Sequence, residues 1–161
     1  MFACAIVALF MAGLYDMNWR ALFVLKSGID VASASELTTN LAEQIRTATW
    51  QQITDPTYLS GTILANSTAT GHLPSVVQKI DVNPYPVPSG YGSPPLGGET
   101  LEVKRDASGN VTTVFSGNGK LPTETAVQID ITLTWSSTFK SIAHTRMVRL
   151  IASPGGVLGQ N

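Results

Sequence analysis

Few residues of this chain could carry out chemistry, and their spacing matches no familiar catalytic or metal-binding pattern. His72 and His144 are far apart in sequence, and neither has a second metal ligand at the spacing of a zinc site. The acidic residues are dispersed and form no calcium-binding cluster. Cys4, the single cysteine, lies in an apolar segment, where we expect it to pack as a small hydrophobic side chain. No phosphate-binding loop or nucleophile elbow occurs. We therefore expect no enzymatic activity, no cofactor and no small-molecule substrate.

One charged pair has an informative spacing. Asp16 and Arg20 are four residues apart, so on a helix they lie on one face and can form an ion pair. Tyr15 and Trp19 flank Asp16, and aromatic side chains of this kind mark the boundary between bilayer and water. The pair is either an ordinary interfacial ion pair or a charge contact between subunits of an assembly.

The element that positions this pair is a long amphipathic helix. Residues 2–15 contain no charge, and apolar residues then recur at three- and four-residue intervals, which is the period of one helix face. Threonines after Arg46 and then Pro56 disfavour further helix. The sequence predicts one helix over about residues 2–53. Its expected packing and assembly positions are Phe10, Leu14, Leu22, Leu25, Ile29, Leu37, Leu41 and Ile45.

The apolar start is short for a membrane-spanning helix. Such a helix needs roughly 20 apolar residues, and this chain has about 15 before Asp16. A cleaved signal peptide would begin with basic residues and give way to mature sequence of another character. Two interpretations remain: the natural N-terminus lies upstream, or a short helix packs against helices of other proteins. We favour the first.

The rest of the chain predicts loops and an antiparallel sheet. Residues 54–99 are expected to form loops with one strand near residues 76–82, and the proline-rich segment 84–95 forms either a rigid loop or a binding epitope. Residues 100–152 predict a β-meander. Strict alternation places one set of residues on the core face of the sheet. They are Val127, Ile129, Ile131, Leu133 and Trp135.

Together these elements predict an α+β chain in two parts. Residues 1–26 form an apolar helix half, and residues 27–161 form a globular domain in which the second half of the helix covers the sheet. The net charge of −1 and the scattered basic residues give no electrostatic basis for binding nucleic acid.

Three groups of residues carry a resemblance to a known family. The runs 8–14 (ALFMAGL) and 18–22 (NWRAL), the helix residues 41–46 (LAEQIR) with Trp50, and the strand 129–135 (IDITLTW) resemble bacterial type IV pilin-like proteins. The closest resemblance is to minor pilins of type IV pili and minor pseudopilins of type II secretion. It implies a ladle-shaped fold, insertion in the bacterial inner membrane with an extracytoplasmic domain, and assembly with other pilin subunits into a filament. The implied roles are protein secretion, cell adhesion or motility.

The resemblance also implies processing of the N-terminus. Members of this group have a short basic leader, an N-methylated first residue after cleavage and a glutamate at the fifth mature position. Ala5 would stand in place of that glutamate if Met1 were the first mature residue. We expect instead that the natural chain begins upstream, which would extend the apolar segment to spanning length. The alternative function is a membrane-anchored extracytoplasmic binding module that uses the Pro/Tyr-rich loop 84–95.

Overall fold

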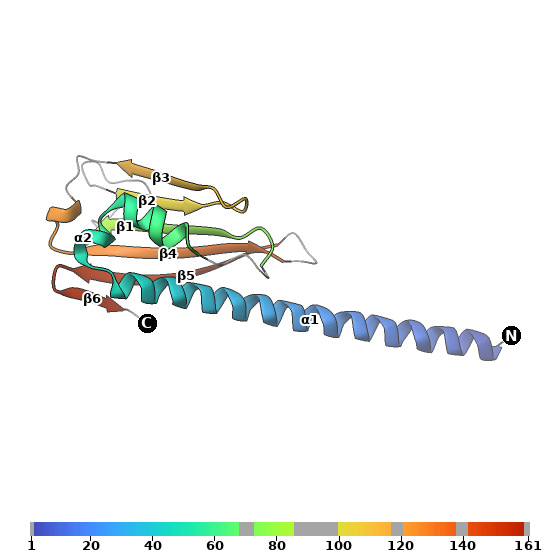
Figure 1. Cartoon of the computed structure of the whole chain (residues 1–161). Coiled ribbons are helices and arrows are strands. Elements are labelled where there is room, and N and C mark those ends of the chain that lie inside the picture. Colours follow the sequence, from blue (N-terminus) through green and yellow to red (C-terminus); the bar gives the residue numbers. More distant parts are fainter. Residues whose placement is uncertain (1, 68–72, 86–99, 117–120, 138–141, 160–161) are drawn as a thin grey trace.

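A single long helix dominates the computed structural model, which describes residues 2–67, 73–85, 100–116, 121–137 and 142–159 (Figure 1). Helix α1 (Phe2–Thr47) has 46 residues and is therefore about 70 Å long. Its N-terminal half projects away from the rest of the molecule, and its C-terminal half lies against a sheet. On the second half, buried residues recur every three or four positions, so one helix face is covered. They are Asp30, Ala34, Thr38, Leu41, Ala42 and Ile45.

Helix α1 ends earlier than the predicted residue 53. The chain leaves helical geometry at Thr49, which has extended dihedral angles and caps a separate short helix, α2 (Trp50–Ile53). The Thr49 amide donates to Oε1 of Gln52 at 2.8 Å, and the Gln52 amide donates back to the Thr49 hydroxyl. This reciprocal capping box satisfies backbone donors at the start of α2. The Thr-x-x-Gln spacing was the overlooked signal.

Residues 56–64, within the segment expected to form loops, are helical. Helix α3 (Pro56–Tyr58) begins with proline at its first turn, and the Asp55 carboxylate accepts a hydrogen bond from the Thr57 amide. A π-helical segment, η1 (Leu59–Leu64), continues from it. The segment is helical rather than a loop because the helix buries the apolar side chains of η1 against the sheet. They are Leu59, Ile63 and Leu64.

The six-stranded sheet is antiparallel throughout, with the order β3-β2-β1-β4-β5-β6. Its strands are β1 (Val77–Pro84), β2 (Thr100–Arg105), β3 (Val111–Ser116), β4 (Val127–Ser136), β5 (Ala143–Ser153) and β6 (Gly156–Gly159). A 3₁₀ turn, η2 (Leu121–Thr123), precedes β4. The α+β class is confirmed.

The prediction of a simple meander over residues 100–152 is wrong, because β1 lies between β2 and β4 in the sheet. Strand β1 alternates buried and half-buried residues and pairs along its length with both neighbours. A central strand satisfies its backbone donors and acceptors on both edges, which an edge strand leaves open. Strand β6 was also not predicted. Pro154 and Gly155 make the turn to it, and Gly156 has φ +138°, a conformation that favours glycine.

The hydrophobic core fills the space between the sheet and the helices α1 and η1. All five residues expected on the core face of β4, Val127, Ile129, Ile131, Leu133 and Trp135, are buried. Val127, Ile129 and Ile131 share one cluster with Leu41 and Ile45 of α1 and the apolar side chains of η1. Leu133 and Trp135 belong to a second cluster, with Ala34 of α1. The domain therefore holds the second half of α1 rigidly and leaves the first half without cover.

Candidate assembly surface

The N-terminal half of α1 is an exposed apolar rod. From residue 5 to residue 29, which we call the shaft, nearly every side chain is exposed, and Leu9 and Tyr15 reach 75%. Ile6, Val7, Leu9 and Phe10 are near-consecutive, so apolar side chains point to all sides of the helix rather than to one stripe. Contiguous exposed apolar surface of this extent marks an interaction site for protein or lipid.

The predicted packing positions fall into two groups. Five lie on the shaft and are between 48% and 67% exposed: Phe10, Leu14, Leu22, Leu25 and Ile29. Two are fully enclosed by the domain, Leu41 at 2% and Ile45 at 0%, and half-buried Leu37 packs on both core clusters. The first group is free to contact other molecules, and the second group holds the chain's own domain together.

Asp16 and Arg20 form the expected ion pair on the shaft. The Arg20 Nε atom lies 2.8 Å from Asp16 Oδ2, and the side chains are 77% and 58% exposed, respectively. An exposed pair of this kind contributes only about 0.2–0.5 kcal/mol to a helix in water. It therefore has little structural value in the isolated chain.

A second pair marks the place where the shaft meets the domain. Lys26 Nζ lies 2.8 Å from Asp30 Oδ1, and the Asp30 side chain is only 5% exposed. Despite this proximity, Oδ1 has no aligned hydrogen bond. The four-residue spacing was visible in the sequence, but the burial of Asp30 was not.

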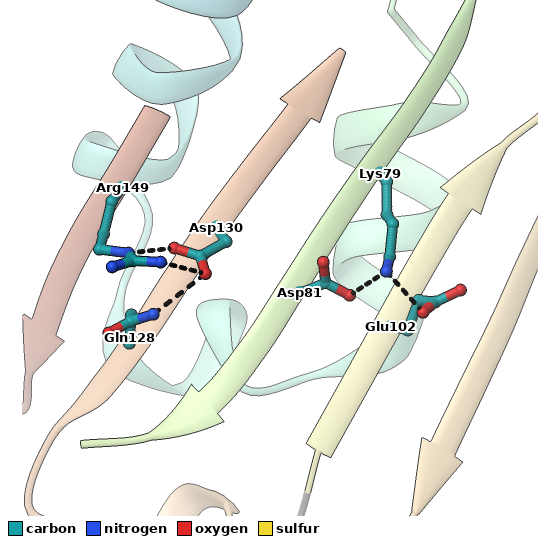
Figure 2. A network of polar contacts seen from close by, with 6 residues as sticks. All are labelled: Lys79, Asp81, Glu102, Gln128, Asp130 and Arg149. Atoms are coloured by element: carbon teal, nitrogen blue, oxygen red, sulfur yellow. Dashed lines mark hydrogen bonds and ion pairs between the residues drawn. The ribbon is translucent and has the colours of Figure 1, made fainter. Parts of the chain in front are cut away.

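The sheet face opposite α1 carries a polar network (Figure 2). Glu102, Asp81 and Asp130 lie in register on the adjacent strands β2, β1 and β4, and Arg149 of β5 lies opposite Asp130. Lys79 Nζ lies 2.9 Å from Glu102 and 3.1 Å from Asp81.

Arg149 completes the other end of this network. Its Nε and Nη2 donate to Asp130 at 2.7 and 3.1 Å, and Gln128 donates to the same carboxylate at 3.0 Å. Three carboxylates in one row thus contact only two cations, Lys79 and Arg149, so the row keeps an excess of negative charge.

The pKa values of this network follow from its geometry. Burial raises the pKa of Asp81 more than its bond to Lys79 lowers it, and repulsion from Glu102 and Asp130 adds to the rise. Burial opposes protonation of Lys79, but its bonds to Glu102 and Asp81 outweigh that effect and raise its pKa. Hydrogen bonding to Asp130 raises the pKa of Arg149. The network is a structural feature of the sheet, with its charges committed to one another.

Two further features could receive a ligand. A shallow groove of about 280 Å³ lies between α1 and residues 66–67, with Asn40, Gln44 and Asn66 in its lining. The loop 84–95 lies outside the described residues except for Pro84, which ends β1, and Tyr85, which is 39% exposed. The described part of the chain contains no group of three or more metal-ligating side chains.

Among the described residues, no helix combines the length and apolarity that crossing a membrane requires. No protein-family model, curated protein or solved structure matches this chain.

Proposed function

We propose that this protein is a structural subunit of a filament, a minor pilin or pseudopilin that inserts in the bacterial inner membrane and assembles through the shaft. The observation that carries the proposal is the shaft itself, a helix half with apolar side chains on all sides that its own domain leaves uncovered. Such a surface is stable when it is surrounded by lipid or by other helices. Its partners would be other pilin or pseudopilin subunits.

The arrangement of the two helix halves supports this role. The domain fixes the C-terminal half of α1 through Leu41 and Ile45, so the shaft is held in one direction relative to the sheet. Parallel packing of many such shafts would bury the apolar surface and place the domains on the outside. The described residues 2–15 carry no charge that such packing would have to bury without a partner.

A charge on the shaft tests the proposal. In full-length protein expressed in bacteria, we expect Leu14→Arg to abolish membrane association or co-sedimentation with other pilin subunits. The control is Thr39→Arg, which places the same charge on an exposed position of the domain half of α1. Normal fractionation of Leu14→Arg would contradict the proposal, as would equal losses in the two variants.

The N-terminus of the native protein gives an independent test. We expect mass spectrometry of membrane fractions to find a processed, N-methylated first residue. An unprocessed and unmodified terminus would contradict prepilin processing and leave a simple membrane anchor.

A further inference from the structure

The two edge strands of the sheet differ in how they are protected. Strand β6, at one edge, has four residues, begins and ends with glycine and contacts α1. Strand β3, at the other edge, has six residues (VTTVFS) with no charge, proline or glycine. Edge strands commonly carry such residues or are covered, because their open backbone groups otherwise pair with another strand. In the described sheet no strand lies beyond β3, so its outer edge is open to a partner.

The register of the β2–β3 hairpin shows which backbone groups of β3 are open. The Asp106 amide donates to the Asn110 carbonyl at 3.0 Å, and hydrogen-bonded pairs alternate along the antiparallel ladder from that point. The even-numbered residues of β3 therefore bond to β2. The N–H and C=O groups of Val111, Thr113 and Phe115 point to the outer edge.

These open groups match those of a second copy in one antiparallel register. When Thr113 lies opposite Thr113 of the second copy, Val111 lies opposite Phe115 and Phe115 lies opposite Val111. All three are then hydrogen-bonded pairs, so every open donor and acceptor of the edge has a partner. A centre at Thr112 or Val114 leaves part of the edge unmatched, because one end of β3 then extends past its partner.

The side chains favour the same register. On the face toward η1, Val111 is half-buried against the core and would contact Phe115 of the second copy, a side chain that is 38% exposed in the single chain. On the other face, Val114, which is 59% exposed, would contact Thr112 of the second copy. Aromatic–β-branched pairs and the central pair of threonines are favourable cross-strand neighbours, and no charge meets a like charge.

We propose that β3 pairs with β3 of a second copy of this chain, antiparallel and centred on Thr113, so that the two sheets become continuous. Both copies use the same surface, so the contact is isologous and closes as a dimer. Because α1 runs lengthwise along the sheet (Figure 1), the two shafts then point in opposite directions. The contact therefore joins copies held in separate filaments or membranes, and it does not depend on the proposed function.

Disulfide cross-linking measures the register. In full-length chains with Cys4→Ala, in detergent micelles that cover the shaft, we expect copies with Thr112→Cys to cross-link to copies with Val114→Cys. Opposite residues of this non-hydrogen-bonded type have Cα atoms about 4.5 Å apart, within the reach of a disulfide. Copies with Thr112→Cys alone, or with Val114→Cys alone, should not cross-link, because their thiols are offset by about 7 Å along the strands.

Charge at position 113 tests the contact itself, because only this position meets its own copy. Thr113 is exposed, so its substitution should leave the fold intact, which circular dichroism checks. We expect Thr113→Lys in both copies, or Thr113→Glu in both copies, to abolish the cross-link between positions 112 and 114. Mixing a Thr113→Lys copy with a Thr113→Glu copy should restore it. An effect confined to the single chain predicts no such rescue.

The outcomes distinguish this inference from filament assembly. Cross-links confined to Thr112→Cys alone, or to Val114→Cys alone, would overturn the register centred on Thr113. Equal cross-linking in every combination, no cross-linking in any, or failure of the mixed charges to restore it would overturn pairing through β3. Each of these results would leave assembly through the shaft standing.

Discussion

Burial divides the apolar side chains of α1 into two groups with different expected effects on stability. Ile45 is fully buried and Ile29 is 53% exposed, although both lie on the same helix and belong to the same apolar pattern. We expect Ile45→Ala to lower the free energy of unfolding by about 2–5 kcal/mol, because it leaves a cavity between α1 and the sheet. Ile29→Ala should change it by less than about 0.5 kcal/mol. Urea denaturation monitored by Trp fluorescence measures both, and equal losses would contradict the assignment of the core.

Asp81 makes a pH-dependent contribution to stability. Its pKa is raised in the folded state, so between the usual value of 3.8 and the raised value the folded chain binds more protons than the unfolded chain. Stability due to this group therefore falls as pH rises through that window and stays lower above it. We expect Asp81→Asn to raise the free energy of unfolding at pH 7 by about 0.5 kcal/mol, because it removes one of three carboxylates in register. The gain in the free energy of unfolding should vanish below pH 3.8, the usual pKa of this carboxyl.

Asp106 provides the matched control of opposite sign. Bonds from the side chain and backbone of Asn110 lower the pKa of this carboxyl. Its stabilisation is therefore present above pH 3.8 and lost as pH falls through the lowered value. Asp106→Asn should lower stability at pH 7, with the difference shrinking in acid. Denaturation curves at pH 3 and pH 7 that move both variants in the same direction would contradict these assignments.

The elements differ in how much of them could be predicted from the sequence. The period of α1, the alternation of β4 and the four-residue spacing of Asp16 and Arg20 are local patterns, and each indicated its structure correctly. The position of β1 between β2 and β4 depends on pairings between residues far apart in the chain, so no local pattern encodes it. The polar row Glu102, Asp81 and Asp130 was missed for the same reason, because it exists only once three strands are in register.

The break between α1 and α2 shows how a few hydrogen bonds outweigh helical periodicity. Thr49 and Gln52 form the capping box that starts α2, and the Trp50 Nε1 atom donates to the Pro122 carbonyl at 3.0 Å. We expect Thr49→Ala to lower the free energy of unfolding by about 1 kcal/mol, because the Gln52 amide loses its acceptor. Thr39→Ala, on the exposed face of α1, is the control and should have a smaller effect. Thermal unfolding followed by circular dichroism compares them.

At the scale of the whole molecule, the domain should fold without the shaft. The core lies entirely between residues 30 and 157, and the shaft contributes no buried apolar side chain to it. We expect residues 26–161 to be soluble and cooperatively folded, with Lys26 retained so that buried Asp30 keeps its ion pair. Insoluble or unfolded protein from this fragment would mean that the shaft is part of the folding unit, contrary to the division at residues 26 and 27.

The direction of α1 relative to the sheet has a mechanical consequence. The helix runs lengthwise beside β5, and the long strands β4 and β5 lie nearly along its axis (Figure 1). A pulling force applied at the tip of the shaft therefore reaches the sheet as shear along the whole contact, rather than as peeling from one end. Under shear, the buried contacts of Ala34, Leu41 and Ile45 bear the load together and must rupture together. We therefore expect the molecule to resist tension along α1 better than force applied across it.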